Sequence, residues 1–329
     1  MFQKWRPVLH FPFPRNCVFM KPLLILFLTS VLVFAQPPKR TYTYKAAGDC
    51  QIQADVYRAP GDAARPVIFS IHGGALIMGN RRGINAAQVE KYVGAGYTVV
   101  SIDYRLAPET KLPAIIEDVQ DAYRWVREKG PELFHADPNR IAVVGHSAGG
   151  YLTLMAGFRL SPRPKALVAF YGYGDIAGAW YSRPDPFYNR QPAVSQEAAR
   201  QAVGTRVIAE DTSNQRGAFY LYCRQRGIWP QEVSGLDPDL EPKAFDPFCP
   251  VRNVTGDYPP TMLLHGDKDT DVPYELSVAM NQELERHHVA HEFVTMPGRG
   301  HGFDRDMQDP EVAAAFDRAL AFLKKYCAP

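Results

Sequence analysis

The chain has 329 residues, of which 46% are hydrophobic and 22% are charged, and its formal net charge at pH 7 is +2. This composition excludes a mainly disordered chain, and the length suits one large α/β domain or about two average domains. Residues 36–329 contain no basic run, which argues against nucleic acid as a partner.

Residues 1–35 have the features of a secretory leader. An apolar stretch, residues 23–35, follows Lys21 and ends in V-F-A, a small-x-small cleavage pattern, just before Gln36 and two prolines. This stretch is short for a bilayer span. We expect a cleaved leader, with Met20 as an alternative start, a secreted or periplasmic protein, and no stable membrane span after cleavage. Cleavage would change the net charge to −2, because the leader holds four basic residues and no acidic ones. An uncleaved membrane anchor is the alternative.

Four cysteines would remain after cleavage of the leader. They are Cys50, Cys223, Cys249 and Cys327. Export implies an oxidising compartment, in which four cysteines allow three complete pairings. The preferred pair is Cys223 with Cys249, because both lie in the same segment, and four buried free thiols are the alternative. No His/Cys spacing indicates a metal site.

Short apolar runs alternate with amphipathic segments along most of the chain. Two alternating runs within residues 41–58 predict an antiparallel hairpin at a sheet edge. The next segments predict a strand at residues 65–74, a helix at 86–93, a strand at 97–103 and a helix at 112–129. Strands that alternate with helices indicate parallel pairing, with helices on both faces of the sheet.

The middle of the chain repeats this pattern and then interrupts it. The sequence predicts a strand at residues 141–144, a helix at 148–157 and a strand at 165–171. Residues 174–258 are rich in aromatic residues and proline and have no clear strand period, so we interpret them as an insertion that covers the sheet edge. Within it, short helices are expected near residues 195–203 and 213–226. Most of its aromatic side chains would form its own small core, and a few would line a pocket.

The alternation resumes at the C-terminal end, with a strand at residues 261–266, a helix at 274–287, a strand at 291–296 and a helix at 310–326. Residues 36–329 are therefore expected to form one α/β domain. Reactive groups of such folds gather at the carboxyl ends of the strands.

Ser147 lies in a G-x-S-x-G pattern between the strand at 141–144 and the helix at 148–157. Gly145 and Gly149 would allow a sharp turn in which a Cβ atom at either position would collide with its surroundings. The turn would expose the Ser147 hydroxyl at the positive end of the helix. A bare pattern of this kind could also be a glycine-rich turn with a capping serine, so partners elsewhere must decide.

Two later loops carry suitable partners. Asp267, Asp269 and Asp271 follow the strand at 261–266, and His301 lies between two glycines after the strand at 291–296. A serine needs an imidazole to accept its proton and a carboxylate to orient that imidazole. The order Ser, Asp, His is that of an α/β-hydrolase triad.

The remaining histidines are expected to have supporting or unrelated roles. His72 and His146 would pack or form hydrogen bonds near the site, and His265 would be structural. The others are expected at a solvated helix end: His287, His288 and His291. The segment H-G-G-A, residues 72–75, would let backbone N–H groups approach a tetrahedral intermediate together with the N–H of Ala148.

Five motifs together resemble the α/β-hydrolase superfamily, specifically esterases of the hormone-sensitive-lipase-like group and their acetyl-xylan-esterase-like relatives. They are H-G-G-A at 72–75, D-Y-R-L-A-P-E at 103–109, G-H-S-A-G-G at 145–150, H-G-D-K-D-T-D-V-P at 265–273 and G-H-G-F at 300–303. The resemblance covers residues 45–173 and 258–327. It implies a mostly parallel central sheet with a cap insertion after the sixth strand, at residues 174–258.

The resemblance also assigns roles to individual residues. The catalytic acid aligns with Asp269, whereas Asp267 and Asp271 would be exposed or cap the loop. The oxyanion-hole donors align with Gly74 and Ala75, and Ala75 stands where relatives often have glycine. The implied enzyme is a serine carboxylesterase that hydrolyses small or medium acyl esters, including acetylated carbohydrate as one option, through an acyl-enzyme and without a cofactor.

Two other functions fit parts of this pattern. A peptidase or amidase resembling the prolyl-oligopeptidase catalytic domain would use the same triad order, although the chain lacks the length for an N-terminal propeller. A ligand-binding protein on the same scaffold, similar to the plant gibberellin receptor, would lack the catalytic histidine, which is present here as His301. The sequence does not indicate an oligomeric state.

Overall fold

The computed structural model describes residues 37–213 and 215–329. The predicted leader, residues 1–35, lies outside these ranges, so its cleavage and the export of the protein stay predictions. Among the helices in the described ranges, none combines the length and the apolar character needed to cross a membrane.

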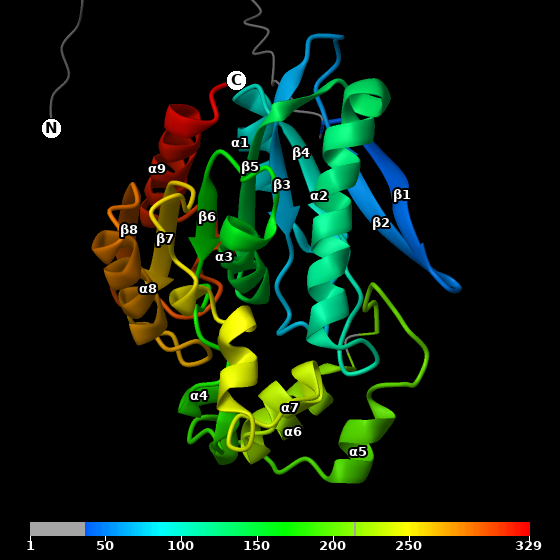
Figure 1. Ribbon diagram of the computed structural model, residues 1–329, viewed down its shortest axis with the longest axis vertical. Helices are drawn as coiled ribbons and strands as arrows, with labels where there is room; N and C mark the ends of the chain where they lie inside the picture. The colour runs from blue at the N-terminus through cyan, green and yellow to red at the C-terminus, as the bar shows by residue number, and fades with distance from the viewer. Residues whose placement is uncertain (1–36, 214) are drawn as a thin grey trace, which may run out of the picture. The chain divides into compact units, whose positions relative to one another are not determined.

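Eight strands form one central sheet in the order β1-β2-β4-β3-β5-β6-β7-β8 (Figure 1). The strands are β1 (Lys39–Ala47), β2 (Cys50–Tyr57), β3 (Arg65–Ile71), β4 (Thr98–Ile102), β5 (Ala136–His146), β6 (Leu167–Phe170), β7 (Thr261–Gly266) and β8 (His291–Met296). The β1–β2 and β2–β4 pairs are antiparallel, and the pairs from β4 to β8 are parallel. The predicted edge hairpin and the mostly parallel sheet are therefore confirmed.

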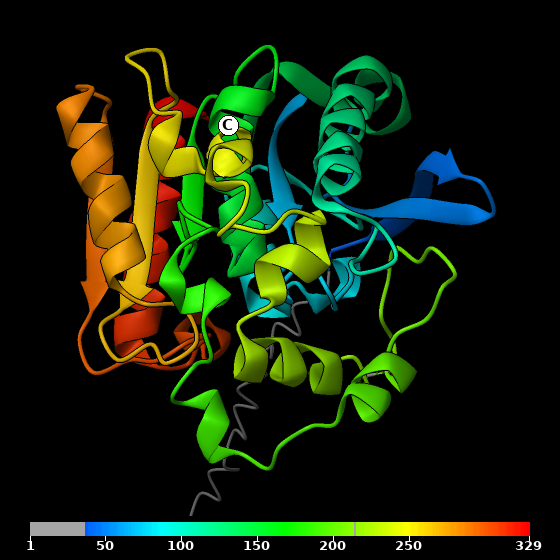
Figure 2. The same cartoon turned by 60° about the horizontal axis from the view of Figure 1, so that its bottom comes forward.

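Helices cover both faces of the sheet, as predicted (Figures 1 and 2). They are α1 (Ala86–Gly94), α2 (Leu112–Phe134), α3 (Ala148–Arg159), α8 (Glu275–Arg286) and α9 (Pro310–Tyr326). Buried residues of α2, α3 and α8 belong to one hydrophobic cluster, and those of α1 and α9 belong to the other. Each cluster also takes alternate side chains from the strands, since successive residues of a strand point to opposite faces.

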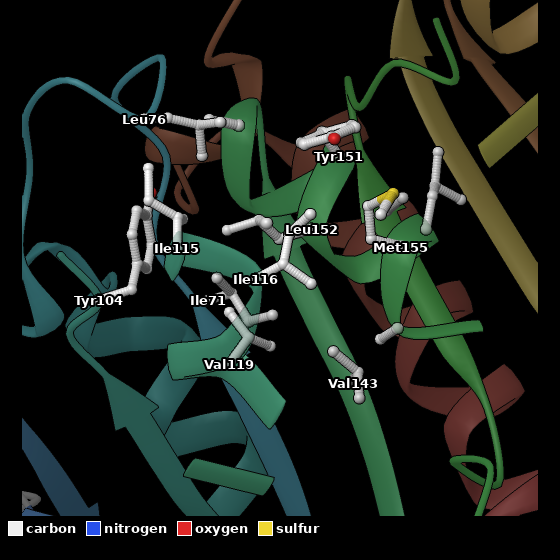
Figure 3. Packing of buried hydrophobic residues seen from close by; sticks show 14 of the residues in the cluster. Ile71, Leu76, Tyr104, Ile115, Ile116, Val119, Val143, Tyr151, Leu152 and Met155 are labelled. Carbon is white, nitrogen blue, oxygen red and sulfur yellow. The ribbon is translucent and has the colours of Figure 1, made fainter. Parts of the chain in front are cut away.

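The hydrophobic cluster that contains residues of α2, α3 and α8 is the larger of the two. Its packing fixes the positions of β5 and α3, the strand and the helix on either side of Ser147. Figure 3 shows Val143 of β5 and Ile71 of β3 near Leu152 and Met155 of α3 and Ile116 of α2. All five side chains are at most 6% exposed. Because protein interiors are close-packed, the turn between β5 and α3 cannot shift without disturbing this core.

Two boundaries differ from the sequence prediction by five residues. Helix α2 extends beyond Lys129 to Phe134, and its C-cap residue His135 has a left-handed φ of 50° and donates its N–H to the carbonyl of Gly130. Strand β5 begins at Ala136, because its first residue already pairs with Arg65 of β3.

The insertion after β6 is confirmed and forms a helical cap at one end of the sheet (Figure 2). Its α-helices are α4 (Ala179–Ser182), α5 (Gln196–Gln201), α6 (Gly217–Arg226) and α7 (Trp229–Ser234), and its 3₁₀ helices are η2 (Tyr188–Arg190), η3 (Pro242–Phe248) and η4 (Pro250–Arg252). Two further 3₁₀ helices lie outside the cap, η1 (Arg81–Gly83) and η5 (Phe303–Arg305). The two predicted cap helices correspond to α5 and α6.

The predicted Cys223–Cys249 disulfide is wrong. Both cysteines are free and buried, as is Cys327, whereas Cys50 is free and only partly buried, so the alternative of four buried free thiols holds for three of the four. Cys223 on α6 and Cys249 both belong to the larger hydrophobic cluster, and the Cys249 thiol also donates to Oδ1 of Asp175 at 3.3 Å. Both thiols are therefore buried without a bond between them, although they lie in the same segment of the sequence.

Candidate active site

Ser147 occupies a sharp turn between β5 and α3. Its φ is 56° and its ψ is −119°, which is unusual for a residue with a side chain. A Cβ atom on Gly145 would lie 2.1 Å from the carbonyl oxygen of Gly149, and one on Gly149 would lie 2.0 Å from that of Ile71. The turn therefore requires both glycines, as the sequence pattern predicts.

Three side chains from distant loops meet at this turn. Nε2 of His301 lies 2.9 Å from Oγ of Ser147, and Nδ1 of His301 lies 2.7 Å from Oδ2 of Asp269. Both distances are hydrogen-bond lengths. The predicted Ser147, Asp269 and His301 are thus brought together in a relay from hydroxyl to imidazole to carboxylate.

Asp269 is held rigidly at the end of β7. Its side chain is fully buried, and its Oδ1 accepts the N–H groups of Asp271 and Val272 at 2.8 and 2.9 Å. Burial by itself raises the pKa of Asp269, but hydrogen bonds from His265 and His301 outweigh burial and hold this pKa well below its ordinary value. The group is therefore an anion at neutral pH and can stabilise an imidazolium.

His301 lies in the loop between β8 and η5 and is 20% exposed. Burial lowers the pKa of His301, whereas the hydrogen bond to Asp269 and the charges of Asp271 and Asp269 raise it, and the net result is a raised pKa. The imidazole is therefore a better base than an ordinary histidine.

The glycine-rich loop after β3 packs directly against the serine turn. A Cβ atom on Gly73 would lie 2.7 Å from the carbonyl oxygen of His146, and one on Gly74, whose φ is 108°, would lie 2.1 Å from that of Met78. Ala75 adopts a positive φ of 54°, and its carbonyl accepts the indole N–H of Trp229 from the cap at 3.0 Å. This contact ties the cap to the loop.

Gly74 and Ala75 line the same cavity as Ser147, and Ala148 begins α3 directly after it. Within the described residues, the N–H groups of Gly74, Ala75 and Ala148 donate no hydrogen bond. The three residues predicted to form an oxyanion hole therefore lie at the cavity or next to the serine, and the binding of a ligand by their N–H groups stays a prediction.

His72 and His146 support the site through packing and hydrogen bonds, as predicted. The His72 ring stacks on Tyr104 with 4.2 Å between ring centroids, and its Nδ1 lies 2.7 Å from the carbonyl oxygen of Gly73. Burial lowers the pKa of His72 to about 4, so its ring is neutral at pH 7. Nε2 of His146 lies 3.1 Å from Oδ2 of Asp304.

Asp304, which the sequence reasoning did not single out, connects the serine turn to the histidine loop. It accepts hydrogen bonds from the Tyr171 hydroxyl and from the Gln88 side chain. The Tyr171 ring lies against the His301 ring, with 4.5 Å between the centroids. The only hint in the sequence is the position of this acid directly after G-H-G-F, since its partners lie far away in the chain.

The prediction that Asp271 is exposed or caps the loop is wrong. Its side chain is only 20% exposed, and its Oδ2 lies 3.5 Å from Nε2 of His301. Its Oδ1 accepts hydrogen bonds from three cap residues, Tyr188, Tyr220 and Arg224. Asp267 does have the predicted role, because it is exposed and its Oδ1 accepts the N–H of Gly298, which joins the two loops.

A cavity of about 470 Å³ opens above the triad. Ser147, His301, Asp271, Gly74 and Ala75 contribute to its wall. A few cap aromatics were expected to line this pocket, but within the described ranges only Tyr220 does. The described ranges contain no group of three or more His, Cys, Asp or Glu side chains suited to a metal ion.

A family model described as alpha/beta hydrolase fold matches residues 68–305 of the chain. Esterase LipC of Mycobacterium tuberculosis is 30% identical over 245 residues, which are 73% of this chain and 53% of that protein. Non-reducing polyketide synthase Preu3 of Preussia isomera is 28% identical over 340 aligned residues, which are 87% of this chain but only 13% of that protein. The chain thus spans about half or less of the length of these relatives.

Solved structures share the fold at low sequence identity. An acetyl ester-xyloside bifunctional hydrolase from Caldicellulosiruptor lactoaceticus aligns with a TM-score of 0.64 and 20% identity. The alignment covers 88% of this chain and 97% of the other.

Proposed function

The chain belongs to the alpha/beta hydrolase fold family, and we propose that it is a serine carboxylesterase that acts on small or medium acyl esters. The observation that carries this proposal is the continuous relay from the Ser147 hydroxyl through His301 to Asp269, at 2.9 and 2.7 Å. Esterase LipC among the sequence relatives supports ester hydrolysis as the reaction.

In the proposed reaction, Oγ of Ser147 attacks the ester carbonyl while Nε2 of His301 takes the hydroxyl proton. The negative oxygen of the tetrahedral intermediate accepts hydrogen bonds from the N–H groups of Gly74, Ala75 and Ala148. One such donor contributes on the order of 10² to 10³ in rate. Asp269 stabilises the imidazolium form of His301 that this step creates.

Collapse of the intermediate breaks the bond to the alcohol oxygen, which receives the proton from Nε2 of His301 and leaves. Water then attacks the acyl-serine with His301 again as the base, and the acid is released from Ser147. Every proton in this scheme passes through Nε2, so the leaving alcohol must lie within hydrogen-bond reach of that atom.

The test combines a kinetic and a labelling experiment. Ser147→Ala is expected to lower the turnover of 4-nitrophenyl acetate by about 10⁶ if the three residues act as a unit. A fluorophosphonate should label the wild-type protein at Ser147 and leave the variant unlabelled. Ser182→Ala is the matched control, because this hydroxyl bonds to the carbonyl of Gly178 in the cap and lies outside the cavity wall.

A folded wild-type protein that neither hydrolyses the ester nor reacts with the probe would contradict the proposal. Faster hydrolysis of aminoacyl anilides than of matched esters would indicate that the protein is an amidase that uses the same triad.

A further inference from the structure

Asp271 presents a second carboxylate to the imidazole of His301, on the side of the substrate cavity. Its Oδ2 lies 3.5 Å from Nε2, the nitrogen that also faces Ser147, whereas Asp269 faces Nδ1. Asp271 and Tyr220 both contribute to the cavity wall. The carboxylate of Asp271 is therefore next to the reacting atoms without belonging to the relay.

The other oxygen of this carboxylate is fixed by the cap. Oδ1 of Asp271 accepts hydrogen bonds from the hydroxyls of Tyr188 and Tyr220 at 2.7 and 2.5 Å and from Nη1 of Arg224 at 2.8 Å. The Arg224 side chain is only 1% exposed and is also paired with Asp185. These contacts hold the carboxylate in one orientation.

Oδ2, in contrast, accepts no hydrogen bond from another residue within the described ranges, and Nε2 of His301 lies 3.5 Å from it. A carboxylate oxygen accepts hydrogen bonds from hydroxyl groups. Oδ2 is thus a preorganised acceptor beside the point at which the alcohol part of a substrate must lie.

The position of the leaving alcohol follows from the proton transfer. Its ester oxygen must approach Nε2 of His301 to within about 2.6–3.2 Å. Two oxygens on neighbouring carbon atoms in a gauche arrangement are about one hydrogen-bond length apart. A hydroxyl on the carbon next to the ester-bearing carbon can therefore reach Oδ2 of Asp271 while the ester oxygen stays at Nε2.

Resting on the proposed function, we propose that Asp271 is a specificity-determining residue that selects alcohols with a free hydroxyl next to the ester. Its Oδ2 accepts the hydrogen bond of that hydroxyl. The corresponding substrate class is the partial esters of diols and polyols. An ether oxygen at the same place has no proton to donate and would face the carboxylate unfavourably, and an anionic substituent there would be repelled.

The experiment compares kcat/KM for 2-hydroxyethyl acetate and 2-methoxyethyl acetate, whose alcohols have similar acidity and differ in the donor. In the wild-type protein, kcat/KM for the hydroxyethyl ester is expected to be roughly tenfold higher than for the methoxyethyl ester. A hydrogen bond to a charged group typically has an effect of about this size. In Asp271→Asn, Tyr188, Tyr220 and Arg224 retain the amide oxygen, so the NH₂ group faces the cavity. This group can donate to a hydroxyl or to an ether, and the ratio should fall towards one.

Tyr222→Phe is the matched control. Tyr222 lies on α6 like Tyr220, but among the described residues it forms no hydrogen bond to Asp271 and does not line the cavity, so the ratio should stay close to that of the wild type. If Asp271→Asn does not fold, Asp271→Ala removes the carboxylate and leaves Arg224 paired with Asp185, and its ratio should also approach one.

The outcomes separate this inference from the esterase proposal. Hydrolysis of both esters with a ratio near one in the wild type overturns the role of Asp271 and leaves the esterase intact. A high ratio that survives in both Asp271 variants also overturns it, because the hydroxyl is then recognised elsewhere. Absence of both ester hydrolysis and fluorophosphonate labelling overturns the esterase proposal itself.

Discussion

Nε2 of His265 lies 3.2 Å from Oδ2 of Asp269, the same oxygen that faces Nδ1 of His301. His265 is fully buried at the end of β7; its Nδ1 lies 2.7 Å from Oγ of Ser277, and its Nε2 lies 3.1 Å from the carbonyl oxygen of Val272. The two oxygens near Nε2 only accept, so Nε2 donates to them. His265, which was expected to be structural, therefore helps to orient Asp269 of the predicted triad.

Replacement of His265 is expected to lower kcat more than it changes KM, because the effect passes through Asp269 and not through substrate contacts. His265→Leu removes the donor and should reduce kcat by roughly 10-fold to 100-fold, by analogy with the loss of hydrogen-bond partners that orient metal ligands. His265→Gln keeps a donor close to the position of Nε2 and should recover part of the loss. Steady-state kinetics together with thermal unfolding of both variants provide the check, and equal kcat in His265→Leu and the wild type would refute it.

In the pH profile of kcat/KM, the midpoint of the acidic limb is expected to lie above the ordinary pKa of histidine. His301 acts as a base only when neutral, so kcat/KM falls as pH decreases through its pKa, which lies above about 6.5. Asp269 and Asp271 raise this pKa and Arg305 lowers it. Asp271→Asn should therefore shift the limb to lower pH, and Arg305→Gln should shift it to higher pH. Shifts in the opposite directions would contradict the assignment.

The raised pKa of His301 also predicts how this residue contributes to the stability of the folded protein at different pH. The folded protein binds the His301 proton more tightly than the unfolded chain does. The contribution is therefore fully present below about pH 6.5 and is lost as pH rises through the folded-state pKa. Unfolding free energies of the wild type and His301→Gln, measured from pH 5 to pH 9, should converge as the pH increases.

Removal of Arg81 should destabilise the protein strongly. Its guanidinium is 7% exposed and contacts Asp55 and Asp103, whose side chains are at most 1% exposed. Burial raises the pKa of Asp103 to about 6 even though Arg81 bonds to it. Arg81→Met leaves both carboxylates without this partner, and a buried pair broken in this way costs about 3–5 kcal/mol.

Arg82 offers a matched control for this prediction. It is 45% exposed, and its guanidinium pairs with Glu210 at 3.0 Å. Because exposed pairs contribute little, Arg82→Met should change the free energy of unfolding by less than about 1 kcal/mol. Urea unfolding followed by tryptophan fluorescence measures both variants, and similar losses in the two would show that burial does not set the cost.

Gly149→Ala should damage both stability and activity. The added Cβ would lie 2.0 Å from the carbonyl oxygen of Ile71, so α3 and β3 must separate. Overpacking of this kind costs about 1–3 kcal/mol. The displacement would also move Ser147 relative to His301, and a shift of about 1 Å can cost 10²-fold in rate.

Gly94→Ala, at the end of α1, is the control because no atom lies within 4 Å of the added Cβ. It should leave esterase activity unchanged, and it should raise stability by at most about 1 kcal/mol, since alanine is favoured over glycine in a helix. Thermal unfolding and ester hydrolysis measured on both variants test the pair. Wild-type behaviour of Gly149→Ala would contradict the close packing of the turn.

The order of strands and helices and the identity of the triad could be predicted from the sequence. Each of these features has a local signal: the apolar period for an element, the two glycines around Ser147, and the short loops that contain Asp269 and His301. Parallel strands then place their carboxyl ends at one edge of the sheet, so local motifs are sufficient to bring three distant loops to the same place.

The surroundings of the triad depended on the tertiary structure. Arg224 and Asp271 are 47 residues apart, and Tyr171 and Asp304 are 133 residues apart. The Cys223–Cys249 prediction failed for the same reason, because closeness in the sequence does not decide which side chains meet. Local sequence patterns predict the backbone geometry and the chemistry of each segment. Contacts between the cap and the sheet, in contrast, form only when folding brings distant segments together.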